Sequence, residues 1–324
     1  MSTRATTPPT TPSTPTTPTG GAGRRNSRTE RLRRTGDWAR RAPLLPALLL
    51  VILVTQLPFV VTIITSFMNW NAYYPDQRGF TGVSNFVTVL SDPDARQAII
   101  VTILLTAAVV LISLALGLGI ALLLDRTFRG RAVVRTMMIT PFLVVPVAAA
   151  LVWKHALYNP EYGLFNGLLK KFFGDGAPQP DWISSYPLWS VIFAIVWQWT
   201  PFMMLILLAG LQSRPLDVIE AARIDGASSW QIFTNMTLPH LRQYIELAGL
   251  LGSIYVVQNF DHVFTITSGG LGTANLPYYI YQTFYTAHDY GLASAAGVVV
   301  VIGTIIIATF ALRTVFSIFR EETR

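Results

Sequence analysis

Four long stretches of this chain contain no Asp, Glu, Lys or Arg, and they limit the folds that the chain can adopt. They are residues 98–124, 136–153, 188–211 and 290–312. Each is long enough to cross the roughly 30 Å hydrocarbon core of a bilayer as a helix, which takes about 20 residues. A large soluble helical protein would interrupt such runs with polar faces. The sequence therefore predicts an all-α polytopic membrane protein.

The charged residues are few and unevenly placed. Of the 324 residues, 52% are hydrophobic and 13% are charged, about half the charged fraction of a usual soluble domain. The formal charge is +7, but nine arginines precede residue 42 and most others lie in short loops between apolar runs. That distribution is typical of a membrane protein's cytoplasmic side, so we expect membrane lipids and no nucleic acid as partners. There is no cysteine, and the histidines show no paired metal spacing, so we expect no metal site.

We predict six membrane spans joined mostly by short loops. Loop 125–135 has four arginines against one aspartate, which is typical of the cytoplasmic side. The fifth span is the least regular, because only fourteen uncharged residues lie between Glu246 and Asp261. Six spans place both termini in the cytoplasm. The predicted spans are about 43–68, 98–124, 136–157, 188–211, 243–264 and 290–316.

The first 42 residues differ from the rest of the chain. Residues 1–23 are almost wholly Thr, Pro, Ser, Gly and Ala, a composition that cannot bury enough surface to fold. Arg24 to Arg41 forms a basic stretch that either orients the first span or binds anionic lipids. We therefore predict two parts, a disordered and then Arg-rich cytoplasmic tail over 1–42 and a six-span membrane domain over 43–324.

A polar insert over residues 212–243 separates the fourth and fifth predicted spans. Glu220, Ala221, Ala222 and Arg223 favour a helix, and Gly226 can take the backbone angles of a sharp turn. Ser228 or Ser229 can cap a second helix that Pro239 would end. From composition alone this insert could be an amphipathic hairpin on the membrane surface.

The residue identities in the insert indicate more than that. Glu-Ala-Ala, three residues, Gly, nine residues, an apolar position, one residue and Leu-Pro resembles the cytoplasmic signature of permease subunits in binding-protein-dependent ATP-binding-cassette (ABC) importers. Met236 stands where that family usually has Ile. The resemblance implies the type I importer permease fold and makes the insert a coupling loop that docks on an ATPase subunit. The residues assigned to it are Glu220, Ala221, Ala222, Asp225, Gly226, Leu238 and Pro239.

Three further stretches resemble particular branches of the same family. Residues 80–86 and 159–166 resemble the sugar-permease branch, and residues 276–282 resemble the sugar-alcohol branch. The resemblance implies a multi-pass subunit of a bacterial plasma (inner) membrane importer for a sugar or sugar alcohol. It also implies partners, namely a second homologous permease subunit, two ATPase subunits and an extracytoplasmic solute-binding protein. No phosphate-binding loop is present, so we expect no enzyme activity and no cofactor here, with ATP and Mg²⁺ on the ATPase.

Polar residues inside predicted spans are expensive and mark candidate solute pathways. One group lies in the fourth span just before Pro201, and another lies at the end of the fifth, where Tyr255, Gln258, Asn259 and His262 would share a helical face. Planar amides beside aromatic rings suit sugars. The alternative is that these side chains form hydrogen bonds between helices. The candidate pathway residues are Trp197, Gln198, Trp199, Tyr255, Gln258, Asn259 and Asp261.

A transporter of another class remains the alternative function. A secondary transporter of a small polar solute, driven by an ion gradient, would need an acid deep in a span and usually shows internal repeats. Asp261 lies near the end of a predicted span, and the sequence shows no repeat. A membrane-embedded enzyme has no supporting motif.

Overall fold

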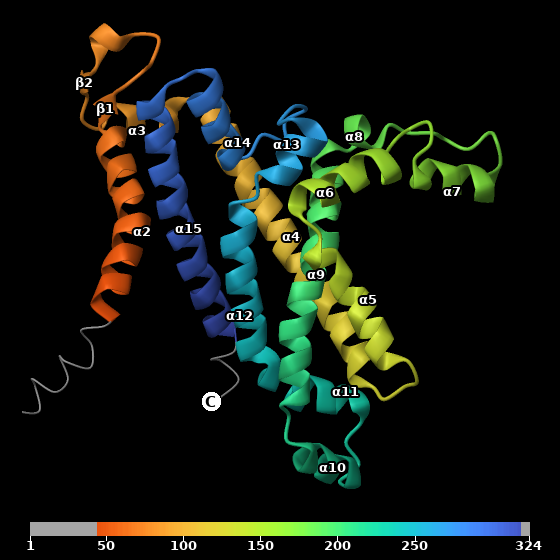
Figure 1. Cartoon of the computed structure of the whole chain (residues 1–324). Helices are drawn as coiled ribbons and strands as arrows, with labels where there is room; N and C mark the ends of the chain where they lie inside the picture. Colours follow the sequence, from red (N-terminus) through yellow and green to blue (C-terminus); the bar gives the residue numbers. More distant parts are fainter. Residues whose placement is uncertain (1–43, 319–324) are drawn as a thin grey trace, which may run out of the picture. The chain divides into compact units, whose positions relative to one another are not determined.

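The computed structural model describes residues 44–318 as helices with one short β-ribbon (Figure 1). The tail predicted for residues 1–42 lies outside the described residues. The longest helices are α2 (Leu45–Ser66), α4 (Pro93–Asp125), α9 (Pro187–Gln212), α12 (Leu238–Val257) and α15 (Tyr290–Ile318). The shorter helices are α3 (Ser84–Ser91), α5 (Arg131–Leu143), α6 (Pro146–Leu151), α7 (Leu164–Phe173), α8 (Trp182–Ser185), α10 (Leu216–Ile224), α11 (Ser229–Ile232), α13 (Asp261–Thr267) and α14 (Leu276–Tyr281). The 3₁₀ segment η2 (Pro75–Gln77) and the π-helical segments η3 (Val152–Leu157), η4 (Phe233–Thr237) and η5 (Gln282–Thr286) complete the helical elements of the described chain.

Each predicted span has a helix at its place. Within residues 44–318, α2, α4 and α9 are long and apolar enough to cross a membrane, and the bent pair of α5 with α6 makes a fourth if it counts as one span. α12 carries Arg242 and Glu246 in its first half. The start of α15, Tyr290–Ile306, is a shorter apolar helix.

The third predicted span is not one straight helix. α5 ends at Leu143, and the chain turns by 97° before α6 begins at Pro146. Val144 and Val145 between them have extended backbones. For Val145 the cause is Pro146, because a residue before proline is driven out of the helical region. Pro141 is accommodated inside α5, so only the second proline of this span marks the bend.

The fifth predicted span also differs from the expected single helix. α12 ends at Val257, and α13 begins only at Asp261. The break holds Gln258, Asn259 and Phe260, and the side-chain amide of Asn275 donates to the Asn259 carbonyl over 2.5 Å. The prediction of one helix through residue 264 is therefore wrong, and so is the single helical face expected for its polar residues.

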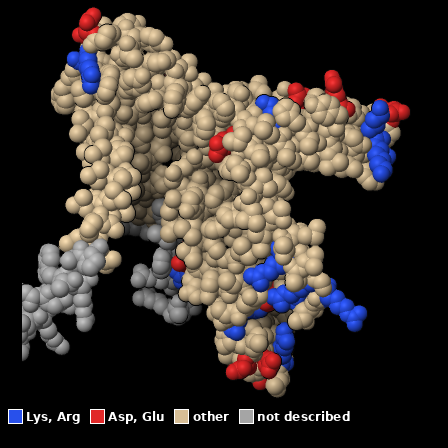
Figure 2. Space-filling model, viewed as in Figure 1, with Lys and Arg blue, Asp and Glu red and all other residues tan. Residues whose placement is uncertain are grey.

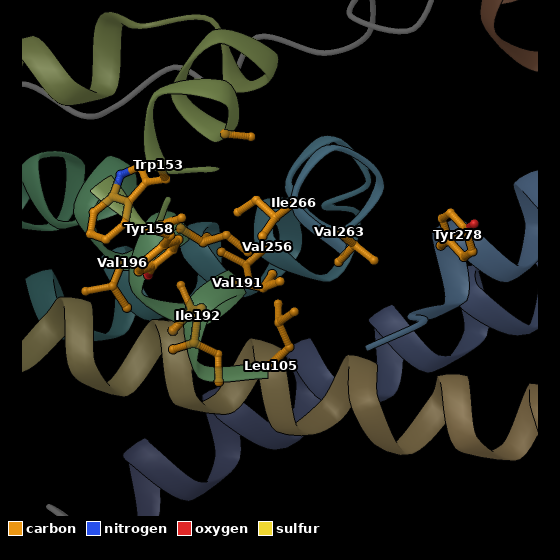
Figure 3. Close-up of a cluster of buried hydrophobic side chains, with 14 residues drawn as sticks. Leu105, Trp153, Tyr158, Val191, Ile192, Val196, Val256, Val263, Ile266 and Tyr278 are labelled. Atoms are coloured by element: carbon orange, nitrogen blue, oxygen red, sulfur yellow. The ribbon is translucent and has the colours of Figure 1, made fainter. Parts of the chain in front are cut away.

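The core lies where α4, α9, α12 and α13 meet (Figure 3). Leu105, Ile192, Ile195 and Val256 are buried there, and α4 approaches α9 closely at Gly117. A Cβ atom at residue 117 would lie 2.9 Å from the backbone nitrogen of Met204. In a bilayer such contacts stabilise the fold through van der Waals packing, since lipid is as apolar as the side chains.

The connection that follows α2 packs against the start of α15. Strands β1 (Met68–Asn69) and β2 (Gly79–Phe80) pair antiparallel, with Met68 opposite Phe80. The backbone amide of Tyr290 donates to the Trp70 carbonyl over 2.8 Å. This ribbon and the segment containing α7 and α8 lie at the opposite end of the long helices from α10 (Figure 1).

Candidate functional site

The predicted coupling loop folds as a helix, a turn and a second helix. α10 ends in a Schellman motif, in which the backbone amide of Ala227 donates to the Ala222 carbonyl (2.9 Å) and that of Gly226 to the Arg223 carbonyl (3.1 Å). Gly226 has a φ of +85°, a left-handed conformation that is strained for residues with a Cβ atom. The turn at Gly226 therefore depends on glycine, as the sequence predicts.

The second helix begins as predicted but does not end as predicted. Ser228 and Gln231 form a capping box, with bonds of 3.3 Å and 2.8 Å between each side chain and the other's backbone amide. We expected Pro239 to stop this helix. Instead α11 continues through η4 into α12, and Pro239 lies in the first turn of α12, directly after the π-helical segment η4.

The loop exposes several large apolar side chains. Ile224 is 87% exposed and Trp230 is 71% exposed, and Leu216 and Val218 in the first turns of α10 are also exposed. Asp217, Glu220, Arg223 and Asp225 surround them with charge. Figure 2 shows Lys, Arg, Asp and Glu gathered at this end of the molecule and at the opposite end, with few of them on the surface between the two ends. Exposed apolar patches rimmed by polar residues are typical of protein interaction surfaces.

The loop is attached closely to the two helices that it joins. A Cβ atom at Gly210 in α9 would lie 2.6 Å from the Tyr244 ring in α12, so glycine at 210 allows the two helices to touch. The hydroxyl of Ser213 lies 2.8 Å from the Tyr244 hydroxyl and 3.1 Å from Nε2 of His240. These contacts fasten the end of α9 to the start of α12.

Two candidate pathway residues form an aromatic pair between α9 and α12. The rings of Trp199 and Tyr255 stack with centroids 5.5 Å apart. Phe142, at the end of α5, contacts the indole edge-on at 5.7 Å, and Phe202 contacts it at 5.5 Å. Tyr255 is 57% exposed, so one face of this aromatic group is open. No sequence pattern indicates Phe142, which reaches the indole because α5 packs against α9.

The other two candidates in α9 point elsewhere. Successive residues of a helix are rotated by about 100° from one another. Trp197 lines an apolar cavity of about 980 Å³ beside Trp153, with ring centroids 6.0 Å apart. Gln198 is buried, and its Nε2 donates to the Val144 carbonyl at the α5–α6 bend over 2.7 Å. The structure thus brings Trp199, but not Trp197 or Gln198, to Tyr255.

The polar residues after α12 occupy the helix break. Gln258 is exposed, and its Nε2 bonds locally to the Ile254 carbonyl over 2.9 Å. The amide nitrogen of Asn259 lies 3.1 Å from Nδ1 of His262, while Oδ1 of Asn259 and Nε2 of His262 are buried without a partner among the described residues. Asp261 is in the first turn of α13, where a helix N-terminus favours negative charge.

Sequence reasoning missed Asn275, which holds this break in place. It caps α14 by accepting from the Tyr278 amide at 3.1 Å, and it donates to the Asn259 carbonyl. Its position before Leu-Pro signals a helix start, but nothing in the sequence indicates the contact with a residue sixteen positions earlier. Within the described chain no three His, Asp or Glu side chains gather as a metal site would require.

The comparison with protein families decides the class of this chain. Residues 113–317 match the family described as binding-protein-dependent transport system inner membrane component. The chain belongs to this family. It is therefore a multi-pass membrane permease subunit and not itself a catalyst, and the matched residues include α9, the coupling loop and α12.

Two relatives and one solved structure show how far this permease resembles known ones. It is 37% identical to "Probable ABC transporter permease protein y4oQ" of Sinorhizobium fredii, covering 78% of this chain and 81% of that one. It is 34% identical to "Trehalose transport system permease protein SugA" of Mycobacterium tuberculosis, covering 79% and 81%. A chain of a bacterial alginate ABC transporter, solved with an alginate pentasaccharide-bound periplasmic protein, matches with a TM-score of 0.73 and 22% identity over 86% of this permease and 93% of that chain.

These similarities confirm the predicted fold class. The permease is an all-α polytopic membrane protein with the architecture of ABC importer permeases. The candidate residues of the coupling loop and of the pathway remain predictions.

Proposed function

We propose that this permease is the membrane subunit of an ATP-driven importer and, with a second homologous permease, encloses the pathway for a sugar or sugar alcohol. A solute-binding protein outside the membrane would deliver the solute. The family assignment and the trehalose-permease relative support the proposal. The structural likeness to the alginate transporter supports only the fold.

The observation that carries the proposal is the exposed apolar surface of the coupling loop. Ile224 and Trp230 would each lose a large area of water contact in a docked complex, and burying one such side chain contributes about 1.5–3 kcal/mol. No phosphate-binding loop is present in the sequence, so ATP and Mg²⁺ would bind to separate ATPase subunits. Two such subunits would then act on this loop and on its counterpart in the second permease.

The structure offers a path from that surface to the aromatic pair. Trp199 precedes the end of α9 by thirteen residues, and Tyr255 follows the start of α12 by seventeen. At 1.5 Å per residue these lengths are about 20 Å and about 26 Å. Two rigid helices fastened to each other at the base of the coupling loop would transmit a push on α10 to the aromatic rings.

The aromatic pair and Gln258 supply the chemistry that suits a carbohydrate. An open aromatic face packs against the C–H surface of a sugar ring, and an exposed amide can donate to and accept from its hydroxyl groups. Hydrophobic and aromatic walls with a few polar groups are usual for small-molecule sites. The second permease would close the pathway on its other side.

The same arrangement supports a particular orientation in the membrane. The α4–α5 connection and the coupling loop lie at one end of the long helices (Figure 1). The connection carries Arg126 and Arg129, and Arg131 begins α5. Arginine-rich short loops face the cytoplasm. We therefore infer that this end is cytoplasmic. Six spans would place both termini on that side.

A pull-down of the tagged permease from its native membrane in mild detergent tests the proposal. We expect an ATPase, a second permease and a solute-binding protein in the mass spectrum. Ile224→Glu should remove the ATPase while leaving the second permease bound. Leu271→Glu, at an exposed apolar residue between α13 and α14, is the matched control and should retain the ATPase.

Two outcomes would contradict the proposal. Recovery of the permease alone, under conditions that preserve other membrane complexes, would favour an ion-gradient-driven secondary transporter. Equal ATPase recovery with Ile224→Glu and with the control would show that the coupling surface lies elsewhere. The recovered binding protein, screened against sugars and polyols, would identify the solute.

A further inference from the structure

The side chain of Arg214 connects three separate elements at the base of the coupling loop. Its Nε donates to the Leu211 carbonyl in the last turn of α9 (2.8 Å). Its Nη1 donates to the Thr237 hydroxyl in η4 (3.0 Å), and its Nη2 bonds to Oδ2 of Asp125, the last residue of α4 (2.5 Å). We refer to Asp125, Leu211, Arg214 and Thr237 as the loop junction.

The loop junction lies at the negative ends of two helices. The C-terminus of a helix carries a partial negative charge, which a nearby cation stabilises. Within the fully described helices α4 and α9, the last turn holds no basic residue, and α4 ends with the acid Asp125. Arg214 supplies the missing positive charge to both ends. Its side chain is 14% exposed and that of Asp125 is 25% exposed, so solvent screens the pair less than it screens a surface pair.

The loop junction also closes the loop on itself. Arg214 precedes α10, and Thr237 is the last residue before α12, so one guanidinium binds the two ends of the intervening segment. Through Asp125 it ties both ends to α4, a helix that the coupling loop does not directly follow or precede. No other residue type could make all three bonds, because only arginine presents five donors in a fixed planar fork.

We propose that Arg214 is a positioning residue that fastens the coupling loop to α4, so that α4 moves with α9 and α12 when the loop is pushed. This inference rests on the proposed function, in which an ATPase acts on the loop. It adds α4 to the helices that move with the coupling loop, and it assigns the link between α4 and the loop to the ion pair of Arg214 with Asp125. With Arg214 replaced, the loop would still join α9 to α12 but would shift relative to the end of α4.

The absence of cysteine from the sequence allows a direct test with two spin labels. Leu123→Cys lies on the exposed side of α4 in its last turn, and Asp217→Cys lies on exposed α10. Distances between nitroxides on these cysteines are measured by pulsed electron resonance in the full complex, without nucleotide and with Mg·ATP and vanadate. We expect one narrow distance distribution that is the same in both states, because the loop and α4 move together.

Substitutions at the loop junction should change that result in a graded way. Arg214→Gln and Asp125→Asn should at least double the width of the distribution, and Arg214→Lys should have an intermediate effect. Asp125→Arg combined with Arg214→Asp should restore part of the narrow distribution, since the ion pair returns but the bonds to Leu211 and Thr237 do not. Lys170→Gln, which removes the well-exposed ion pair between Lys170 of α7 and Asp175, is the control and should leave the width unchanged.

An unchanged width in Arg214→Gln and Asp125→Asn, in complexes that retain all subunits, would overturn the inference. An equally broadened distance distribution in Lys170→Gln would also overturn it, because the broadening would then not be specific to the loop junction. The ATPase content of the unsubstituted sample is measured separately, and its absence would refute the proposed function. A missing ATPase would therefore count against the proposed function, whereas an unchanged width with the ATPase present would count against the role of Arg214 alone.

Discussion

The indole of Trp199 stacks on the phenol ring of Tyr255, with ring planes inclined by 29°. The two residues come from α9 and α12, the helices that enter and leave the coupling loop. Any rotation of one helix against the other must therefore break or remake this stack. Such an aromatic pair contributes about 0.5–1.5 kcal/mol beyond the area that it buries, which is little enough to be exchanged for contact with a solute during each transport cycle.

Replacement of the stacked indole should weaken solute binding. We expect Trp199→Ala to raise the apparent KM of uptake about 2- to 10-fold, the factor that corresponds to one lost aromatic contact. The apparent KM is measured from uptake into proteoliposomes that contain the full complex. Trp189→Ala is the matched control, because Trp189 is another tryptophan of α9 but is exposed and lines the apolar cavity. Equal changes in KM for the two variants would contradict the assignment of Trp199 to the pathway.

The turn of the coupling loop should tolerate no β-branched residue. Gly226 has a φ of +85°, and this left-handed conformation costs a residue with a Cβ atom about 1–2 kcal/mol and a β-branched residue more. We expect Gly226→Val to abolish uptake without reducing expression. Gly226→Asn should keep part of the activity, since asparagine also occurs at such helix ends.

A second glycine provides the control for that prediction. Gly176 lies in the loop between α7 and α8, where a Cβ atom would meet nothing within 4 Å and φ is not positive. Gly176→Val should therefore leave uptake unchanged. Normal uptake in Gly226→Val would refute the role of the coupling loop.

Sequence patterns predicted the helices better than they predicted the interruptions. The uncharged runs identify α4 and α9 because a bilayer requires long apolar helices. The 97° bend at Val144 was not predictable, since Pro141 and Pro201 lie inside continuous helices while Pro146 follows a break. A tertiary contact accompanies that bend, in which Gln198 from another helix binds the freed carbonyl.

The candidate pathway residues were also grouped wrongly because the sequence pattern did not reveal a helix interruption. Helical periodicity grouped Tyr255 with Gln258 and Asn259, on the assumption that α12 continues. The helix ends first, and the carbonyl of Asn259 bonds to Asn275 instead. Long-range contacts of this kind leave no periodic signal, whereas the turn at Gly226 is local and could be predicted from residue type.

Gln198 should act through stability and not through solute binding. Gln198→Met removes the donor to the Val144 carbonyl, and it also removes the buried Oε1 that has no partner among the described residues. We expect the free energy of unfolding of the complex to fall by about 0.5–1 kcal/mol, the usual size for a hydrogen bond between membrane helices. The apparent KM should not change. Thermal unfolding measures the change in stability, and uptake by the same preparation measures the apparent KM.

A control within the same helix separates this bond from a local one. The Thr200 hydroxyl bonds to the Val196 carbonyl one turn earlier, so Thr200→Val removes a bond within α9 only and should destabilise the complex less. A raised KM in Gln198→Met with unchanged thermal stability would mean that Gln198 contacts the solute.

The two amides in the break after α12 should behave differently from each other. Gln258 is exposed and bonds only within its own turn, so Gln258→Ala should leave thermal stability unchanged. It should raise the apparent KM about 2- to 10-fold, as expected for one lost hydrogen bond to a solute.

Asn259→Ala keeps the backbone carbonyl that binds Asn275 but leaves Nδ1 of the buried His262 without its partner. That loss should lower the free energy of unfolding by about 1–3 kcal/mol, and transport should fall because less complex is folded. If Gln258→Ala instead lowers thermal stability and leaves the apparent KM unchanged, the break is only a structural connection between α12 and α13, and the solute does not contact Gln258.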